Sequence, residues 1–175
     1  MAESHDAIVI VVACVIAFVL QIVVAPYIAL GNALPNFVVA FVFLCAILRF
    51  QAFGCVMPFV VGLAFDFVCG SVVGAMAFSL TLFSVVAARA FFTLNNDTLF
   101  MPFVIMALGL ILTEATYGIV LIATGYQAGF LEAFVYRALP CALYDFVVAI
   151  LFYPLAARFF RGGTQSTPIM TTQLR

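Results

Sequence analysis

The chain has 175 residues, of which 68% are hydrophobic and 7% are charged, and its formal net charge is −1. Soluble domains carry about 25% charged residues and about 45–50% apolar residues, so this composition excludes a water-soluble fold. It predicts an integral membrane protein that is surrounded by a lipid bilayer, and the near-neutral charge gives no reason to expect nucleic-acid binding.

Six apolar segments are predicted to form membrane helices, because a bilayer core about 30 Å thick requires about 20 helical residues. We expect them at 7–30, 35–50, 54–68, 71–92, 99–124 and 137–160. They predict one all-α bundle over residues 1–161, followed by a disordered polar tail over residues 162–175.

The first segment follows an acidic N-terminus, MAESHD, and is longer than the apolar part of a cleaved signal peptide. We therefore expect it to remain as the first helix, with a kink at Pro26 near its end. Ser71 is the expected N-cap of the fourth helix.

The basic residues predict the direction of the bundle. All six are arginines, and placing both termini in the cytoplasm leaves only Arg137 on the outer side, as the positive-inside rule favours. The expected inner arginines are Arg49, Arg89, Arg158, Arg161 and Arg175.

At about 1.5 Å of rise per residue, the polar residues inside the predicted helices fall at similar depths in the outer half of the bundle. We expect a polar cluster that consists of Gln21, Asp66, Glu114, Tyr117, Arg137 and Asp145. A carboxylate within a bilayer needs a partner, a water-filled cavity or a proton. Three interpretations stay open: protonated acids with hydrogen-bond partners, an outward-facing wet cup, or a docking surface for a partner's polar or basic groups.

Asp66 has a structural alternative, because it could accept hydrogen bonds from the backbone amides around residues 70–72 that open the fourth helix. Glu114 lies in the middle of its predicted helix and has no such explanation, so a specific role is expected for it. We predict that small residues around Asp66 serve helix packing within the chain. In this prediction Gly54 and Gly62 allow a close neighbour, Gly70 and Ser71 form a turn, and Gly74 thins the start of the fourth helix.

Three segments, in order, carry a family resemblance: LQIVVAP at 20–26, LPNFVVAFVFLCAILR at 34–49 and GCVMPFVVGLAFDFVCGSVVGAMAF at 54–78. They match a Leu-Gln followed by Pro, a helix opening on Pro35 and Asn36, and the pattern Gly-x-x-x-Asp-x-x-x-Gly-Ser-x-x-Gly. In these features the chain resembles the MreD family of bacterial rod shape-determining membrane proteins. Beyond about residue 90 the resemblance consists mainly of hydropathy and an acidic residue in the fifth helix, Glu114.

The resemblance implies a non-enzymatic scaffold, without a cofactor, in the cell-elongation machinery (the elongasome) that organises peptidoglycan synthesis and cell shape. It implies a multi-pass protein of the bacterial plasma (inner) membrane. The implied partners are an MreC-like protein, a RodA-type glycosyltransferase with its transpeptidase, and MreB filaments, contacted directly or indirectly.

The sequence is less consistent with two other classes of function. An enzyme is disfavoured because the predicted bundle contains single acids on separate helices and no histidine, and because His5 and five cysteines without a CxxC pair predict no zinc site. The alternative function is a small-molecule carrier, because the MreD fold resembles the six-helix S-component of energy-coupling-factor vitamin transporters.

Overall fold

The computed structural model describes residues 2–29, 34–70, 72–93, 100–125 and 138–161. These residues form six α-helices and one 3₁₀ helix, with no β-strand among them, so the expected all-α fold is confirmed for the described part of the chain. The elements are α1 (Ala2–Val23), η1 (Ala25–Ile28), α2 (Phe37–Phe53), α3 (Val56–Cys69), α4 (Ala75–Thr93), α5 (Met101–Ala123) and α7 (Leu139–Arg161).

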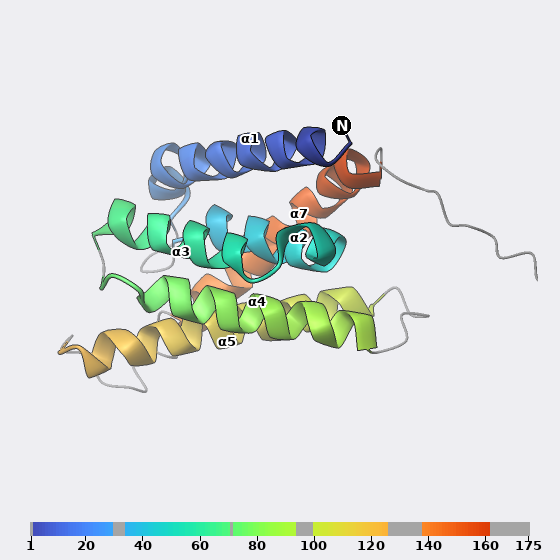
Figure 1. The fold of residues 1–175 in the computed structure, drawn as a ribbon. Helices are drawn as coiled ribbons and strands as arrows, with labels where there is room; N and C mark the ends of the chain where they lie inside the picture. The colour runs from blue at the N-terminus through green and yellow to red at the C-terminus, as the bar shows by residue number, and fades with distance from the viewer. Residues whose placement is uncertain (1, 30–33, 71, 94–99, 126–137, 162–175) are drawn as a thin grey trace, which may run out of the picture.

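The helices form a bundle in which successive helices run in opposite directions, and α2 lies at its centre (Figure 1). Helix α2 packs against α1, α3, α4, α5 and α7. Its side chains are correspondingly buried, including Val38, Val39 and Phe43, which have no exposed surface. The start of α1 and the end of α7 lie at the same end of the bundle, the right-hand end in Figure 1.

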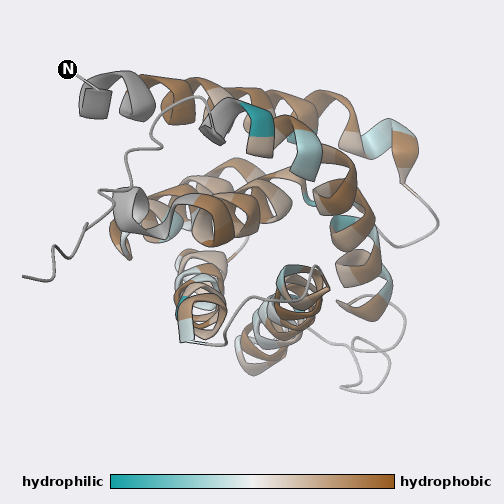
Figure 2. Ribbon diagram, turned by 90° about the vertical axis from the view of Figure 1, so that its right-hand side faces the viewer, coloured by the Kyte–Doolittle hydropathy of each residue, from teal (hydrophilic) through white to brown (hydrophobic). Residues whose placement is uncertain are grey.

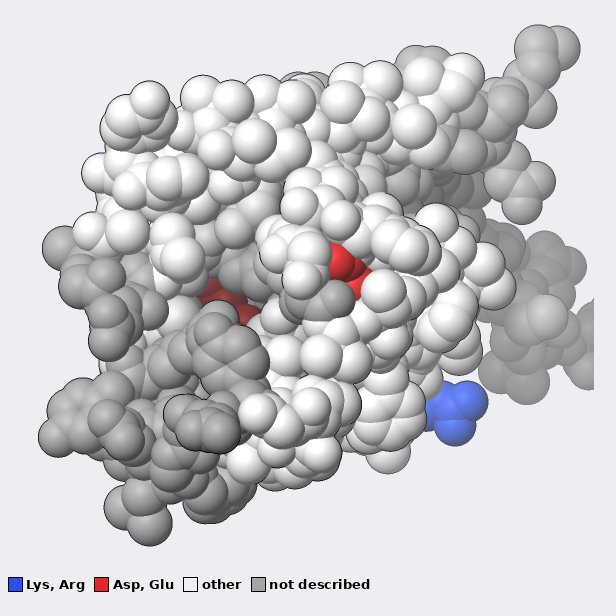
Figure 3. All heavy atoms as spheres, turned by 90° about the vertical axis from the view of Figure 1, so that its left-hand side faces the viewer, with Lys and Arg blue, Asp and Glu red and all other residues white. Residues whose placement is uncertain are grey.

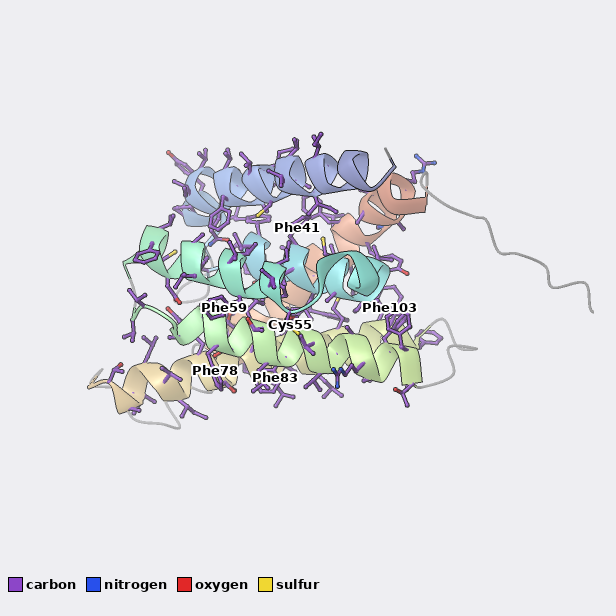
Figure 4. The ribbon with its side chains drawn as sticks, in the orientation of Figure 1. Phe41, Cys55, Phe59, Phe78, Phe83 and Phe103 are labelled. Carbon is purple, nitrogen blue, oxygen red and sulfur yellow. The ribbon has the colours of Figure 1, made fainter. Side chains whose placement is uncertain are left out.

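The outer surface of the bundle is apolar. Hydrophobic residues cover most of every helix in Figure 2, and many point away from the bundle, such as Phe59 on α3 and Phe78 on α4 (Figure 4). Phe78 is 56% exposed and Leu151 is 72% exposed. Monomeric soluble proteins rarely expose apolar surface of this extent, whereas helices in lipid do so routinely.

Three helices are long and apolar enough to cross a membrane: Ala75–Thr93, Met101–Ala123 and Leu139–Arg158. The apolar stretches Ile8–Val23, Phe37–Leu48 and Val56–Cys69 are shorter. The described residues therefore support a membrane-embedded chain, and the expected number of six crossings stays a prediction.

Two helix boundaries differ from expectation for local reasons. Helix α1 ends at Val23 and not near residue 30, because Pro26 lacks the N–H that would continue the helix and instead opens the 3₁₀ turn η1. Helix α4 begins at Ala75, four residues later than predicted. Ser71, Arg137 and the tail at 162–175 lie outside the described residues.

Close approaches between helices occur at two glycines. A Cβ atom added to Gly62 on α3 would lie 2.6 Å from the Cα of Ala77 on α4, so the two backbones touch there. A Cβ at Gly109 on α5 would overlap the ring of Phe43 on α2. Small residues that allow such contacts are typical of helix packing in lipid.

No atom lies within 4 Å of a Cβ built at Gly54 or at Gly74, so the structure shows no close helix contact at either position. Both residues instead have a positive φ, 53° and 96°, which glycine adopts without a steric penalty. Gly70 also has a positive φ, 62°, and ends α3 as its left-handed C-cap, with its N–H donating to the carbonyl of Asp66.

Candidate functional site

Asp66 caps a helix to which it does not belong. It lies in the last turn of α3, is fully buried, and its carboxylate accepts hydrogen bonds from the first N–H groups of the α4 segment. The Oδ2 atom lies 2.9 Å from the nitrogen of Gly74, and the two oxygens lie 3.2 and 3.1 Å from the nitrogen of Met76. A carboxylate at a helix N-terminus satisfies amides that have no partner within the helix and complements the helix dipole.

The nitrogen of Ala77 also donates to Oδ2 of Asp66, at 3.3 Å. A capping role for Asp66 was one of the expectations, but these donors lie later in the chain than the amides around residues 70–72. The difference follows from the late start of α4 at Ala75, which moves the free amides toward Gly74 and beyond.

Asp145 accepts a hydrogen bond from the backbone at the N-terminus of α2. It lies on α7 with no exposed surface, and its Oδ1 accepts a short hydrogen bond from the backbone N–H of Asn36, directly before α2. The side chain of Asn36 caps the same helix, because its Oδ1 accepts a hydrogen bond from the nitrogen of Val39 at 3.2 Å. Two buried aspartates thus hold the N-termini of two different helices.

Gln21 connects α1 to the start of α2. Its Oε1 accepts a hydrogen bond from the nitrogen of Phe37 at 2.8 Å, and its Nε2 donates to the carbonyl of Pro35 at 3.2 Å. Tyr144, next to Asp145 on α7, donates its hydroxyl to the carbonyl of Ile28 at 2.7 Å. Side-chain hydrogen bonds therefore connect the end of α1 to the start of α2, and the end of η1 to α7.

Glu114 and Tyr117 lie on the buried face of α5, one turn apart. Glu114 is 8% exposed, and its carboxyl group interacts electrostatically with that of Asp145. The second oxygen of Asp145, Oδ2, is buried and has no hydrogen-bond partner. This oxygen distinguishes Asp145 from Asp66, whose two oxygens both accept hydrogen bonds.

The capping aspartates and their partners gather at the end of the bundle where α2 and α4 begin. Figure 3 looks onto this end and shows Asp and Glu atoms in separate places, largely covered by atoms of residues without a charge. Arg89 and Arg158 are exposed and lie toward the ends of α4 and α7, at the opposite end of the bundle. The buried acids therefore lie toward one end of the bundle, and Arg89 and Arg158 lie toward the other.

The structure thus brings Gln21, Asn36, Asp145 and Glu114 into one interhelical region and engages Asp66 separately with α4. No group of three His, Cys, Asp or Glu residues among those described is arranged to hold a metal ion. The hydrogen-bonded polar side chains of this region join helices to one another, which is a structural use of buried polarity.

Some of these contacts were missed in the sequence. The hydrogen bond of Tyr144 and the contact between Gly109 and Phe43 could not be predicted, because neither residue type identifies a partner that lies far away in the chain. Asn36 offered a usable signal, since an asparagine directly before an apolar run is typical of a helix N-cap.

A family model for MreD, the rod shape-determining protein MreD, matches residues 4–162. The chain belongs to the MreD family. No curated protein and no solved structure matches it. MreD membership implies a role in rod-shape determination, and it agrees with the membrane character of the helices. The similarity to energy-coupling-factor S-components stays a prediction.

Proposed function

We propose that this MreD-family chain is a non-enzymatic membrane scaffold of the cell-elongation machinery. It holds an MreC-like protein and thereby helps to organise peptidoglycan synthesis by a RodA-type glycosyltransferase and its transpeptidase, near MreB filaments. The observation that carries the proposal is the family match over residues 4–162.

The use of the polar side chains supports a scaffold over an enzyme. Asp66, Asp145, Asn36 and Gln21 are engaged with backbone groups of neighbouring helices. A catalytic acid or base must reach the reacting atoms of a substrate. Side chains that are buried and bonded in this way serve the shape of the bundle.

The apolar surface supports binding of a partner within the membrane. Helix α1 packs mainly on α2 and leaves a row of exposed residues. This row consists of Ile8, Val11, Val12, Val15, Ile16, Val19, Ile22 and Val23. Because the acids are buried, we expect them to act on partner binding by holding α2 and α4 in place and not by touching the partner.

We also propose that all six helices cross the plasma membrane, with both termini in the cytoplasm. The start of α1 and the end of α7 share one end of the bundle, which suits an even number of crossings (Figure 1). Exposed Arg89 and Arg158 lie toward that end, whereas the buried acids lie toward the other, in accordance with the positive-inside rule.

Complementation and co-purification test the scaffold. Cells depleted of the protein should lose their rod shape, and a tagged copy of the full chain should restore it and retain an MreC-like protein in detergent. The matched comparison is Glu114→Leu against Leu112→Ala, a change on the exposed face of the same helix.

We expect Glu114→Leu to weaken both rod shape and retention and Leu112→Ala to leave both unchanged. Normal cell shape after depletion, or no more MreC-like protein retained than by an unrelated membrane protein, would reject the scaffold. Normal shape and retention in Glu114→Leu would keep the scaffold and remove the acidic region from its function.

A further inference from the structure

The second oxygen of Asp145 needs a hydrogen-bond donor. Asp145 has no exposed surface, its Oδ1 accepts from the N–H of Asn36, and its Oδ2 has no partner. Leaving a buried acceptor without a donor costs the full desolvation penalty of that atom, and native structures rarely accept this cost. A hydrogen-bond donor to Oδ2 is therefore expected among the groups that pack against Asp145.

Glu114 is the buried acid that interacts electrostatically with Asp145. Helices α5 and α7 pack against each other, and Glu114 and Asp145 are both on buried faces. Glu114 lies nine residues before the end of α5 and Asp145 six residues after the start of α7, so both acids lie in the adjoining halves of two consecutive described helices that pack against each other. Their carboxyl groups interact electrostatically.

Two hydroxyl groups next to these acids in the sequence donate to backbone carbonyls. Thr113 donates to the carbonyl of Gly109 at 2.8 Å, and Tyr144 donates to the carbonyl of Ile28 at 2.7 Å. The N–H of Asn36, directly before α2, donates to Oδ1 of Asp145. Tyr117 lies one turn beyond Glu114 on α5, and the exposed Arg89 and Arg158 lie toward the opposite end of the bundle.

We propose that Glu114 and Asp145 bind one proton between them. Glu114 carries it as a carboxylic acid whose O–H donates to Oδ2 of Asp145, and the negative charge stays on Asp145. The N-terminus of α2 stabilises that charge through the N–H of Asn36 and the helix dipole. Two neighbouring carboxyl groups that cannot both ionise at low cost commonly share a proton in this way.

A proton suits this place better than a metal ion. Hard cations such as Ca²⁺ and Mg²⁺ require six or more oxygen ligands, or several bound waters. The described residues contain no group of three His, Cys, Asp or Glu that could hold a metal ion. A proton needs only the two carboxyl groups and no cavity.

The shared proton would complete a chain of hydrogen bonds from α5 through α7 to α2. Loss of the proton would bring two negative charges together in a medium of low dielectric constant, where their repulsion is strong. The packing of α5 on α7 would then depend on protonation. This inference does not depend on the scaffold function proposed above.

Infrared spectroscopy of the full chain in lipid tests the proposal directly, because a protonated carboxylic acid has a carbonyl stretch that a carboxylate lacks. We expect this band at neutral pH in the wild type, its loss in Glu114→Gln, and its retention in Asp66→Asn, because Asp66 accepts N–H donors with both oxygens. Absence of the band from the wild type, or its persistence in both Glu114→Gln and Asp145→Asn, would overturn the proposal.

Thermal unfolding provides a second measurement that relies on a conservative replacement. The amide of Gln can donate to Oδ2 of Asp145 as the carboxylic acid does, whereas Met fills similar volume without a donor. We expect Glu114→Gln to keep the Tm near that of the wild type and Glu114→Met to lower it by roughly 3 °C or more. Equal Tm values for the two variants would contradict the hydrogen bond.

Discussion

Asp66 on α3 holds the backbone amide of Met76 on α4, with its two carboxylate oxygens 3.2 and 3.1 Å from that nitrogen. Asp145 on α7 accepts a hydrogen bond from the amide of Asn36, directly before α2, through Oδ1 alone. In both cases a buried acid from one helix completes the N-terminus of another. The negative charge is thereby stabilised where a bilayer would otherwise make it costly.

Removal of the Asp66 carboxylate should destabilise the bundle. Asp66→Ala leaves the amides of Gly74, Met76 and Ala77 without this acceptor, so we expect a loss of about 3 kcal/mol or more in the free energy of unfolding. Asp66→Asn keeps one acceptor oxygen and should lose less. Denaturation in detergent, followed by circular dichroism, measures both, and equal stability of Asp66→Ala and wild type would contradict the capping role.

A methyl group at Gly62 should separate α3 from α4. Because the new Cβ would lie 2.6 Å from the Cα of Ala77, we expect Gly62→Ala to cost about 1–3 kcal/mol. Gly118→Ala on α5 is the matched control, since nothing lies within 4 Å of its Cβ, and there the gain in helix propensity should leave stability unchanged or raise it by up to about 1 kcal/mol. Denaturation in detergent measures the free energy of unfolding of both variants. A Gly62→Ala variant as stable as Gly118→Ala would contradict the close contact.

Loss of the Gln21 side-chain amide should expose the start of α2 to exchange. Gln21→Leu removes the acceptor of the Phe37 N–H, so deuterium uptake in the peptide that covers Pro35 to Val39 should become faster. The global stability should fall by about 1–2 kcal/mol. Ile22→Ala, next to it but 57% exposed, is expected to leave the exchange of this peptide unchanged.

A native cysteine reports the proposed orientation. Cys69 is exposed at the end of α3 where the aspartates cap their helices, whereas Cys55 is exposed at the start of α3. A membrane-impermeant maleimide added to intact cells with an opened outer envelope should label Cys69 and spare Cys55. Cys69→Ser should abolish the signal. Labelling of Cys69 only after the membrane is permeabilised would contradict the proposed topology and indicate the opposite one.

Much of the fold could be predicted from the sequence because hydropathy determines where a chain enters a bilayer. The apolar runs predicted an all-α bundle with six helices, and the interruptions by Pro, Gly and Asn placed their ends approximately. The boundaries near Pro26 and before Ala75 were less accurate, because the exact end of a helix depends on which groups satisfy its free backbone atoms.

The candidate site was predicted less completely. Depth along each helix placed Gln21, Glu114 and Asp145 in one region, since rise per residue is nearly constant. Their partners could not be predicted in the same way, because rotation of each helix about its axis decides which side chains meet. The hydrogen bond between Asp145 and Asn36 joins residues 109 positions apart, and no local pattern indicates it.

That separation in the chain also has a consequence for biogenesis. Helix α2 is synthesised early, but the acid that accepts the hydrogen bond at its N-terminus lies on α7, 109 residues later than Asn36. Until α7 enters the bilayer, the amide of Asn36 lacks its acceptor, Oδ1 of Asp145, and the N-terminus of α2 is incompletely hydrogen-bonded. Insertion of α7 supplies the acceptor for the Asn36 N–H and completes the packing around α2. We therefore expect chains truncated before α7 to be degraded by membrane proteases more readily than the full chain.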